Sequence, residues 1–291
     1  MHQNHIKKLA AIHDLSGIGR VSLTSVIPIL SSMGVQVCPL PTAVLSTHTQ
    51  YENFYKVDLT EHLQPFINHW QKLEIDFDAI YSGYLASAAQ VEIVVRLIET
   101  FYKKGLMVVV DPVMGDNGST YESLGDDLVQ EMKRLITKAD IITPNLTEAA
   151  LLLDEPYDPN VDIQTIKEWL VRLSDKGPST VIITSVPELL HKKITSVVAY
   201  EALTQRFWKV SCHYLPANYP GTGDSFTSVV TGALLQGDSL PIALDRAVQF
   251  ISYGVRATFG HNYDTREGIM LERILKNLDN PVTMGTYEML D

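Results

Sequence analysis

The feature that most constrains the fold is a regular alternation of short, apolar, β-branched runs with longer segments of helical periodicity. Most of the runs are continuously apolar, which is typical of parallel strands covered by helices on both faces. Strands are predicted at Leu9–His13, Val35–Leu40, Ala79–Tyr81, Met107–Asp111, Ile141–Thr143 and Val181–Thr184. Between them, helices are predicted at Val21–Met33, Leu59–Lys72, Ala89–Lys104, Asp126–Lys138 and Ile163–Asp175.

The order of these segments predicts an α/β protein with three layers, in which helices cover both faces of a mostly parallel central sheet. Beyond residue 185 the pattern changes, and Ile194–Tyr200 and Arg206–His213 are predicted to form antiparallel strands at one edge of the sheet. Helices return at Gly223–Leu235 and Pro241–Phe259. No repeat or linker-like stretch divides the sequence, so all 291 residues are predicted to form one domain.

Composition and charge narrow the class of protein. The net charge of −11 argues against a nucleic acid or an anionic membrane bound through overall charge. No uncharged apolar run approaches the roughly 20 residues that span a bilayer. Met1–Lys8 lacks the apolar core of a secretory signal, and Cys38 and Cys212 show no disulfide or zinc spacing. The cytoplasm is therefore the expected location, with neither nucleic acid nor membrane as a partner.

The segment with the clearest chemical signature is Pro220–Phe226, which reads Pro-Gly-Thr-Gly-Asp-Ser-Phe ahead of a helical pattern. Its two glycines, Gly221 and Gly223, allow a tight turn and close approach of the backbone to a ligand. The start of the following helix offers unpaired N–H groups and the positive end of the helix dipole, which suit phosphoryl oxygens. Asp224 admits a second interpretation, because an aspartate here would also cap the helix, an interaction that stabilises by about 1 kcal/mol.

A second group of polar residues follows two strands that are predicted neighbours. Asp111 and Asp116 follow the most apolar strand, and Asn145 and Glu148 follow the next strand along the chain. Open α/β sheets bind ligands at the carboxyl ends of their strands, so we expect these side chains to meet there. Oxygen ligands of this type suit Mg²⁺, and clustered acids need a cation or a proton. The alternative is an ordinary turn, where Asp is common.

Two further polar positions lie in loops near the same predicted edge. Asp14 ends the first strand, and the glycine fingerprint of a dinucleotide site is incomplete after it because Ser22 replaces the third glycine. Asp14 is instead expected to hydrogen-bond a substrate. His48 could serve as a general base, although a lone loop histidine is more often only solvated or hydrogen-bonded. His13, at the end of a buried strand, is expected to be a structural residue with its hydrogen bonds satisfied.

The motifs, taken in order, resemble those of the pyridoxal kinases in the ribokinase-like superfamily: Ser46–Tyr51, Ser82–Tyr84, Asp111–Asp116, Thr143–Asn145 and Gly221–Asp224. The resemblance runs from about Leu9 to Phe259. It implies a ribokinase-like fold and ATP-dependent phosphorylation of the 5′-hydroxymethyl group of pyridoxal, pyridoxamine or pyridoxine. It also implies a homodimer that uses ATP, Mg²⁺ and often a monovalent cation, K⁺ or Na⁺.

The resemblance further implies roles for individual residues. Asp224 would be the base that faces the substrate hydroxyl, and N–H groups to the phosphoryl oxygens would come from Gly221, Thr222 and Gly223. The substrate ring would be contacted by Thr49, Gln50 and Tyr84. The nucleotide phosphates would be surrounded by Asp111, Asp116, Tyr121, Thr143, Asn145, Glu148, Thr184 and Thr222. Of these, the metal ligands would be Asp111, Asn145 and Glu148. Tyr121 belongs to the stretch Asn117–Tyr121, which is predicted to be flexible and able to close over ATP.

Asp14 departs from the pattern of many pyridoxal kinases, which carry serine in the turn after the first strand. An acidic residue there resembles the hydroxymethylpyrimidine kinases of thiamin synthesis. We expect Asp14 to accept a hydrogen bond from the phenolic hydroxyl or ring nitrogen of the substrate and to bias the choice among vitamers. Three alternatives to a vitamin B6 kinase stay open at this point. They are a hydroxymethylpyrimidine kinase, a non-catalytic vitamer-binding protein and, as the most distant, a nicotinamide-dependent Rossmann enzyme.

Overall fold

The computed structural model describes residues 6–121, 126–188, 194–279 and 285–291. Residues 1–5, part of the segment predicted to carry no secretory signal, lie outside this range. The main sheet of the described chain is built from β1 (Lys8–Ser16), β2 (Gln36–Leu45), β3 (Lys56–Asp58), β4 (Ala79–Ser82), β5 (Met107–Val110), β8 (Ile141–Ile142), β9 (Thr180–Pro187), β10 (Ile194–Glu201), β11 (Arg206–His213) and β12 (Tyr287–Leu290). A separate hairpin is formed by β6 (Gly115–Asp116) and β7 (Ser119–Thr120).

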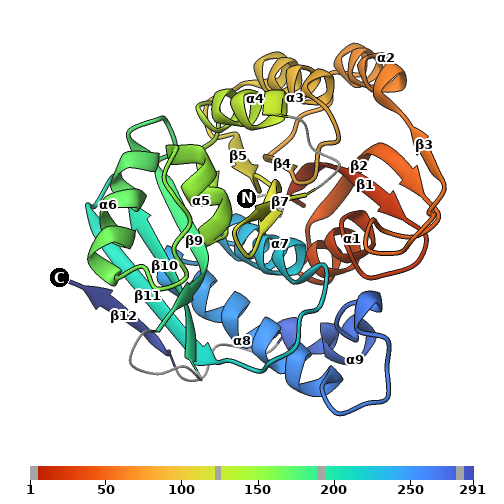
Figure 1. Cartoon of the computed structure of the whole chain (residues 1–291). Coiled ribbons are helices and arrows are strands. Elements are labelled where there is room, and N and C mark those ends of the chain that lie inside the picture. Colours follow the sequence, from red (N-terminus) through yellow and green to blue (C-terminus); the bar gives the residue numbers. More distant parts are fainter. Residues whose placement is uncertain (1–5, 122–125, 189–193, 280–284) are drawn as a thin grey trace.

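The strands of the main sheet lie in the order β12-β11-β10-β9-β8-β5-β4-β1-β2-β3. Neighbours from β9 to β2 pair in parallel, and β10, β11 and β12 continue the sheet antiparallel beyond β9. The predicted antiparallel edge is confirmed. A second one, unpredicted, is made by β3 at the opposite end of the sheet (Figure 1). Because β1 lies between β2 and β4, the direction of winding reverses at β1, and open α/β sheets bind ligands at such a point.

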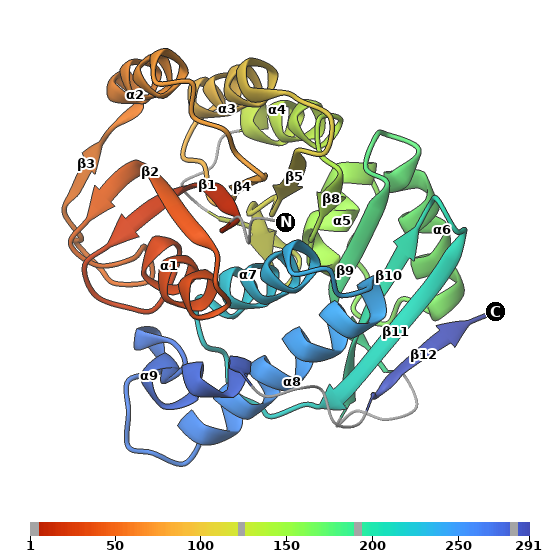
Figure 2. The same ribbon diagram turned by 180° about the vertical axis from the view of Figure 1, so that it is seen from behind.

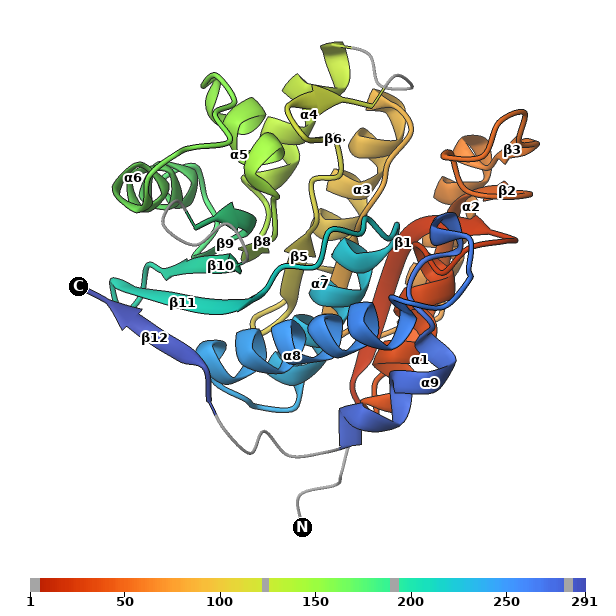
Figure 3. The same ribbon diagram turned by 60° about the horizontal axis from the view of Figure 1, so that its bottom comes forward.

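Helices cover both faces of the sheet (Figures 1 and 2). One layer consists of α2 (Thr60–Lys72), α3 (Ala88–Phe101), α4 (Asp126–Ile136), α5 (Leu146–Leu153) and α6 (Ile163–Ser174). The other consists of α1 (Leu23–Ser32), α7 (Thr222–Leu235), α8 (Leu240–Thr258) and α9 (Leu271–Ile274), with short 3₁₀ turns before and after α9 (Figure 3). Within the described residues, no helix is long and apolar enough to cross a membrane.

The apolar runs of the sequence are explained by the two cores on either side of the sheet. In β1, Ala10 and Ile12 pack into the core beneath α2 to α6, whereas Leu9 and Ala11 pack into the core beneath α1, α7 and α8. Successive side chains of a strand point to opposite faces, so a strand covered on both sides is apolar throughout. The predicted three-layer α/β/α fold is therefore confirmed.

The segment predicted to be a flexible cover over ATP has a regular conformation. Asn117 and Gly118 have positive φ angles of 50° and 81°, and they form the two-residue turn between β6 and β7. The Gly118 N–H donates to Thr147 Oγ1 at 3.0 Å, and a Cβ at Gly118 would lie 2.6 Å from the Tyr157 ring. The hairpin is thus packed against the start of α5.

Candidate active site

The predicted site residues gather where the parallel strands end and α7 begins. Asp14 lies on β1, Tyr84 follows β4, Asp111 follows β5, and Asn145 follows β8. The start of α7 lies across these strand ends. A Cβ at Gly223 would be 3.8 Å from Asp111 Oδ2, and the Thr227 hydroxyl donates to the Thr143 hydroxyl at 2.9 Å. The structure therefore brings the predicted phosphate turn beside the predicted acidic cluster.

Gly221 fixes the position of the first turn of α7. It is the N-cap residue, its φ of 80° lies in the left-handed region, and a Cβ there would lie 2.0 Å from the Arg20 carbonyl oxygen. Only glycine fits both the conformation and the close approach. Within the described chain no side chain caps α7, so the N–H groups of its first turn are open to an anion.

Asp224 does not cap α7, so that alternative interpretation is wrong. Gly221 holds the N-cap position, and Asp224 is the third residue of the helix. One carboxylate oxygen, Oδ2, accepts a hydrogen bond from the Ser22 N–H at 2.8 Å. The other, Oδ1, lies 3.6 Å from His13 Nδ1. Its side chain is only 13% exposed, and its two carboxylate oxygens lie against His13 and Ser22.

The acidic cluster is electrostatically unfavourable in the absence of a cation. Burial raises the pKa of the Asp111 carboxyl well above its ordinary value, and the charges of Glu148 and Asp224 raise that pKa further. Burial also raises the pKa of Glu148, against backbone hydrogen bonds that lower it. The pKa of the Tyr121 hydroxyl is raised by burial and then by Glu148 and Asp116. A site of this kind holds a proton until positive charge arrives.

Asn145 and Glu148 form a capping box at the start of α5. Asn145 Oδ1 accepts from the Glu148 N–H at 3.0 Å, and Glu148 Oε2 accepts from the Asn145 N–H at 2.8 Å. Glu148 Oε1 accepts from the Met114 N–H, and Asn145 Nδ2 donates to the Gly115 carbonyl. Both predicted metal ligands therefore already use the polar atoms of their side chains in holding the backbone.

The donor set fits a divalent cation in part. In the described part of the chain no group of three or more His, Cys, Asp and Glu side chains is placed to hold a metal ion. Asp111 is nevertheless a buried carboxyl, and the nearby hydroxyls of Thr143 and Thr227 lower its pKa only in part against the effect of burial. A cation beside it would remove the repulsion from Glu148 and Asp224. Asp111 is accordingly the best-placed of the three predicted ligands.

The other predicted nucleotide residues line the same edge. Thr143 is buried, and Thr184 forms a β-bridge to Asn145 and donates its N–H to the Pro144 carbonyl at 2.9 Å. Asp116 accepts hydrogen bonds from the backbone and side chain of the neighbouring Asn117. Tyr121 donates its N–H to the Met114 carbonyl, and its side chain is 39% exposed.

The predicted substrate residues differ in how far they are buried. Asp14 is buried, and its two oxygens accept hydrogen bonds from Ser22 Oγ at 2.5 Å and Ser16 Oγ at 2.9 Å. Burial raises the pKa of Asp14 in spite of these bonds. Tyr84 is half-buried, whereas Thr49 and Gln50 are exposed in the loop after β2. The loop is held by His48, whose Nε2 contacts the Arg266 carbonyl oxygen at 2.6 Å. The hydrogen-bonded interpretation of His48 is confirmed.

Sequence reasoning missed three contributions to this site. Ser22 was noted only as a missing glycine, yet its N–H and hydroxyl hold Asp224 and Asp14. Thr227 links α7 to β8. His13 was expected to have satisfied hydrogen bonds, and that is wrong: the ring is fully buried and neither nitrogen has a hydrogen-bond partner among the described residues. Its position directly before Asp14 was the one available signal.

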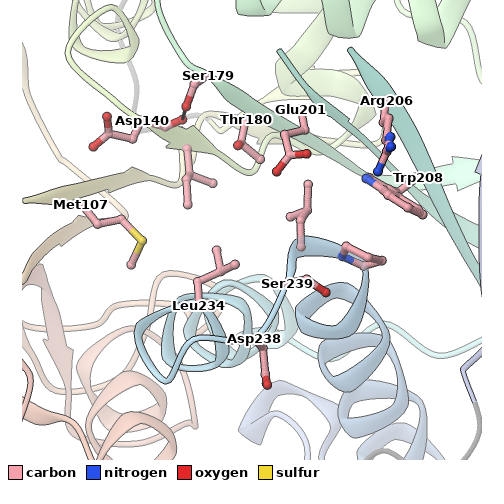
Figure 4. Close-up of a pocket in the computed structure, with 13 residues that line it drawn as sticks. Met107, Asp140, Ser179, Thr180, Glu201, Arg206, Trp208, Leu234, Asp238 and Ser239 are labelled. Atoms are coloured by element: carbon pink, nitrogen blue, oxygen red, sulfur yellow. Dashed lines mark hydrogen bonds between the residues drawn. The ribbon is translucent and has the colours of Figure 1, made fainter. Parts of the chain in front are cut away.

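A cavity of about 540 Å³ lies at the opposite, amino-terminal edge of the strands (Figure 4). It is lined by the beginnings of β5, β8 and β9, by the end of β10, by β11, and by the junction of α7 and α8. Trp208 and Arg206 face it from β11, while Asp238 on its rim is ion-paired with Arg246 at 2.6 Å. None of the predicted site residues lines this cavity.

Residues 29–268 match the protein family described as phosphomethylpyrimidine kinase. The chain belongs to this family. A similar solved structure is a Bacteroides thetaiotaomicron protein named as a phosphomethylpyrimidine kinase, with 60% identity, a TM-score of 0.96 and full coverage of both chains. A second crystal form of that protein, described as a form with pyridoxal, also has a TM-score of 0.96 and covers 98% of this chain and 100% of that one.

Within the phosphomethylpyrimidine kinase family, the chain is also similar to pyridoxal kinases. The Lactobacillus plantarum pyridoxal kinase is 33% identical, with a TM-score of 0.86, and the match covers 94% of this chain and 97% of that one. The Arabidopsis thaliana pyridoxal kinase is 27% identical over 84% of this chain and 79% of its own length. The resemblance seen in the ordered motifs is thereby confirmed.

Proposed function

We propose that the chain is a kinase that transfers the γ-phosphoryl group of ATP to the 5′-hydroxymethyl group of pyridoxal, pyridoxine or pyridoxamine. One observation carries the proposal: the protein that is 60% identical over almost the whole chain has been crystallised with pyridoxal. The geometry suits this chemistry, because the start of α7, which no described side chain caps, lies beside Asp111, a buried carboxyl whose pKa is raised by burial and by neighbouring acids. Phosphoryl transfer asks mainly for positioning and for stabilisation of charge.

In the proposed reaction, the start of α7 binds the phosphoryl group and provides the base, and the acidic cluster holds the metal ion. N–H groups of Gly221, Thr222 and Gly223 would bind the oxygens of the γ-phosphoryl group as negative charge moves onto the leaving ADP. The substrate oxygen forms its bond to the γ-phosphorus while the bond to the bridging oxygen breaks. Asp224 takes the hydroxyl proton late in this step, so it needs no unusual basicity beforehand. Mg²⁺, when bound, supplies positive charge to the phosphate oxygens.

The remaining residues would bind and orient the two substrates. Asp111 would hold Mg²⁺, with Glu148 and Asn145 beside it. The nucleotide would also contact Asp116, Tyr121, Thr143, Thr184 and Thr222. Thr49, Gln50 and Tyr84 would contact the pyridine ring. Asp14 would accept a hydrogen bond from its phenolic hydroxyl or nitrogen. This assignment is supported by the convergence of these residues at one edge of the sheet.

A panel of acceptors tests the proposal. Purified protein with ATP and Mg²⁺ is given pyridoxal, pyridoxine, pyridoxamine or hydroxymethylpyrimidine, and initial rates are measured by ADP release and by mass of the product. We expect kcat/KM to be highest for a vitamin B6 alcohol. Two observations support the alternative, a hydroxymethylpyrimidine kinase: the chain belongs to the phosphomethylpyrimidine kinase family, and Asp14 is acidic. A higher kcat/KM for hydroxymethylpyrimidine would replace our proposal with that alternative.

Asp14→Asn tests which substrate feature this carboxylate recognises. A hydrogen bond to a charged group contributes about 1.5–3 kcal/mol, so we expect kcat/KM to fall roughly tenfold or more for the preferred vitamer. The loss should differ among the three vitamers. If the kinetic constants of all three stayed unchanged, Asp14 would have no part in substrate recognition.

The assembly and the cellular location are part of the same proposal. A homodimer in the cytoplasm, activated by K⁺ or Na⁺, is expected from the resemblance and from the sequence composition. Light scattering coupled to gel filtration gives the mass of the particle. Initial rates in buffers with only K⁺, Na⁺ or a large organic cation give the requirement for a monovalent ion.

A further inference from the structure

His13 is a buried titratable side chain that the proposed reaction does not yet use. It ends the apolar run of β1 and is completely inaccessible to solvent, and neither ring nitrogen has a hydrogen-bond partner among the described residues. Burying a polar group without a partner destabilises a protein, so such groups are rare and call for an explanation. The groups in contact with the His13 ring therefore have to explain why its nitrogens are buried without a partner.

The ring is fixed in place by β4. It packs edge-on against Tyr81, with ring centroids 4.4 Å apart and an interplanar angle of 80°. On its other side is Gly83, where a Cβ would lie only 2.4 Å from His13 Nδ1 and 2.5 Å from Cε1. Gly83 is not among the glycines with a positive φ. The histidine ring, and not the backbone conformation, therefore requires glycine at position 83.

The fixed ring faces the proposed base. His13 Nδ1 lies 3.6 Å from Asp224 Oδ1, slightly beyond hydrogen-bond length, while Asp224 Oδ2 is already held by the Ser22 N–H at 2.8 Å. Catalytic hydrogen bonds are often long before substrate binds and shorten afterwards. The other ionisable neighbours described at this point are the Tyr81 ring and Asp14, whose pKa is raised by burial and also by the charge of Asp224.

We propose that His13 is a positioning residue: its Nδ1–H donates to Asp224 Oδ1, so that the two carboxylate oxygens are held from both sides. The Ser22 N–H alone would leave the carboxylate free to turn about its last side-chain bond. The second donor fixes the plane of the carboxylate toward the substrate hydroxyl. Misplacement of a reacting group by about 1 Å can lower a rate a hundredfold. The inference rests on the proposed function of Asp224 as the base.

Two substitutions of His13 separate this role from simple space filling. His13→Leu keeps an apolar side chain without a donor, and His13→Gln keeps a donor. We expect His13→Leu to lower kcat by roughly 10–100-fold, with KM for ATP and pyridoxal changed less than about threefold. His13→Gln should recover most of the lost kcat. A ring that only fills space gives the reverse order, in which the leucine variant is as active as wild type and the glutamine variant is worse.

A double-variant cycle shows whether His13 acts through Asp224. In the Asp224→Asn background, adding His13→Leu should change the residual rate by less than about twofold, because the carboxylate that the ring positions is gone. An equal factor in both backgrounds would mean that the two residues act independently, which would overturn the proposal.

An NMR comparison of the wild-type protein with Asp224→Asn needs neither a folded leucine variant nor turnover. With histidine labelled by ¹⁵N, the Nδ1 resonance of His13 is compared in wild type and Asp224→Asn, both with ADP and pyridoxal added. We expect a donating N–H at Nδ1 whose resonance moves when the carboxylate is replaced. An identical resonance in the two proteins would overturn the pairing. Absence of vitamin B6 kinase activity in wild type would instead overturn the proposed function, while this spectrum would still decide the contact.

Discussion

Two helices, α5 and α7, begin at the same edge of the sheet, but only the first turn of α5 is capped by side chains. At α5, Asn145 and Glu148 close the turn by a capping box in which side chains and backbone satisfy each other. At α7, Gly221 occupies the N-cap position in a left-handed conformation, and no described side chain caps the turn. At the start of α5 the polar side chains form hydrogen bonds that stabilise the helix, whereas at the start of α7 the N–H groups stay available to a ligand.

The residue at the N-cap decides which role a helix start can take. Both starts carry an acidic residue in the first turn, Glu148 at α5 and Asp224 at α7. Asn145 turns its side chain back on its own helix. Glycine cannot do so, and the absence of a Cβ also lets the backbone of α7 approach Arg20. Asp224 is then free to contact β1 and the following loop.

Among the variants of the two helix starts, Asp224→Asn is expected to lower kcat the most. The amide keeps the shape of the carboxylate but cannot take the hydroxyl proton, so kcat should fall by about 10³-fold, within the range for loss of a general base. Binding of pyridoxal, measured by calorimetry, should stay within a few fold of wild type. A variant with wild-type turnover would remove Asp224 from the chemistry and leave α7 as an anion site only.

Gly221→Ala and Gly223→Ala form a matched pair within one turn. At Gly221 a methyl group collides with the Arg20 carbonyl oxygen at a positive φ, so stability should fall by about 1–3 kcal/mol and kcat/KM for ATP by at least tenfold. At Gly223 the nearest atom outside the turn is Asp111 Oδ2 at 3.8 Å, so the fold should tolerate alanine. Its methyl group would lower kcat/KM for ATP without lowering the melting temperature. Equal melting temperatures for both variants would contradict this account of Gly221.

The pH dependence of stability tests whether Glu148, at the start of α5, holds a proton in the folded chain. Burial raises the folded-state pKa of Glu148 above its ordinary value of 4.5, so the folded chain keeps a proton that the unfolded chain releases. The free energy of unfolding should therefore fall as pH rises from about 4.5 to the raised pKa. In metal-free buffer, Glu148→Gln should be less stable overall but should show a shallower fall with pH. The same slope in both proteins, measured by urea unfolding, would place the titration elsewhere.

Asn145→Ala is expected to have the smallest effect. Loss of the cap should lower the free energy of unfolding by about 1 kcal/mol, and Asn145→Ser, which keeps a capping oxygen, should recover most of it. We expect kcat to change less than it does for either glycine variant of α7. The Mg²⁺ dependence of the rate decides whether Asn145 is also a metal ligand: a shift of more than about tenfold would mean that its amide oxygen leaves the cap to bind the ion.

The central part of the fold could be predicted because its strands are buried on both faces and therefore read as continuous apolar runs. The edge strands could not. Lys56–Asp58 and Tyr287–Leu290 are short and mixed in polarity, so their pairing depends on neighbours far away in the sequence. α5 was missed for a different reason. Asn145 and Glu148 have the spacing of a capping box, but from the sequence we interpret them only as ligands.

The same distinction holds for the site. Gly221–Asp224 and Asp111 could be found because glycine turns and acidic strand ends have local signatures. The state of His13 could not, since it depends on Tyr81 and Gly83, which reach the ring only when β4 pairs with β1. For Asp224, the hydrogen bond from Ser22 spans 202 residues of sequence, and no local pattern announces it.

That long-range contact has a consequence for how ligands act on the whole molecule. The anion site exists only when Arg20 and Ser22 meet Gly221 and Asp224, so neither half of the chain can bind by itself. A ligand that binds only the assembled site adds its binding free energy to the folded state, about 2.7 kcal/mol at a concentration one hundred times its Kd. Substrate would thus protect the entire sheet against unfolding and proteolysis, including strands that it never touches.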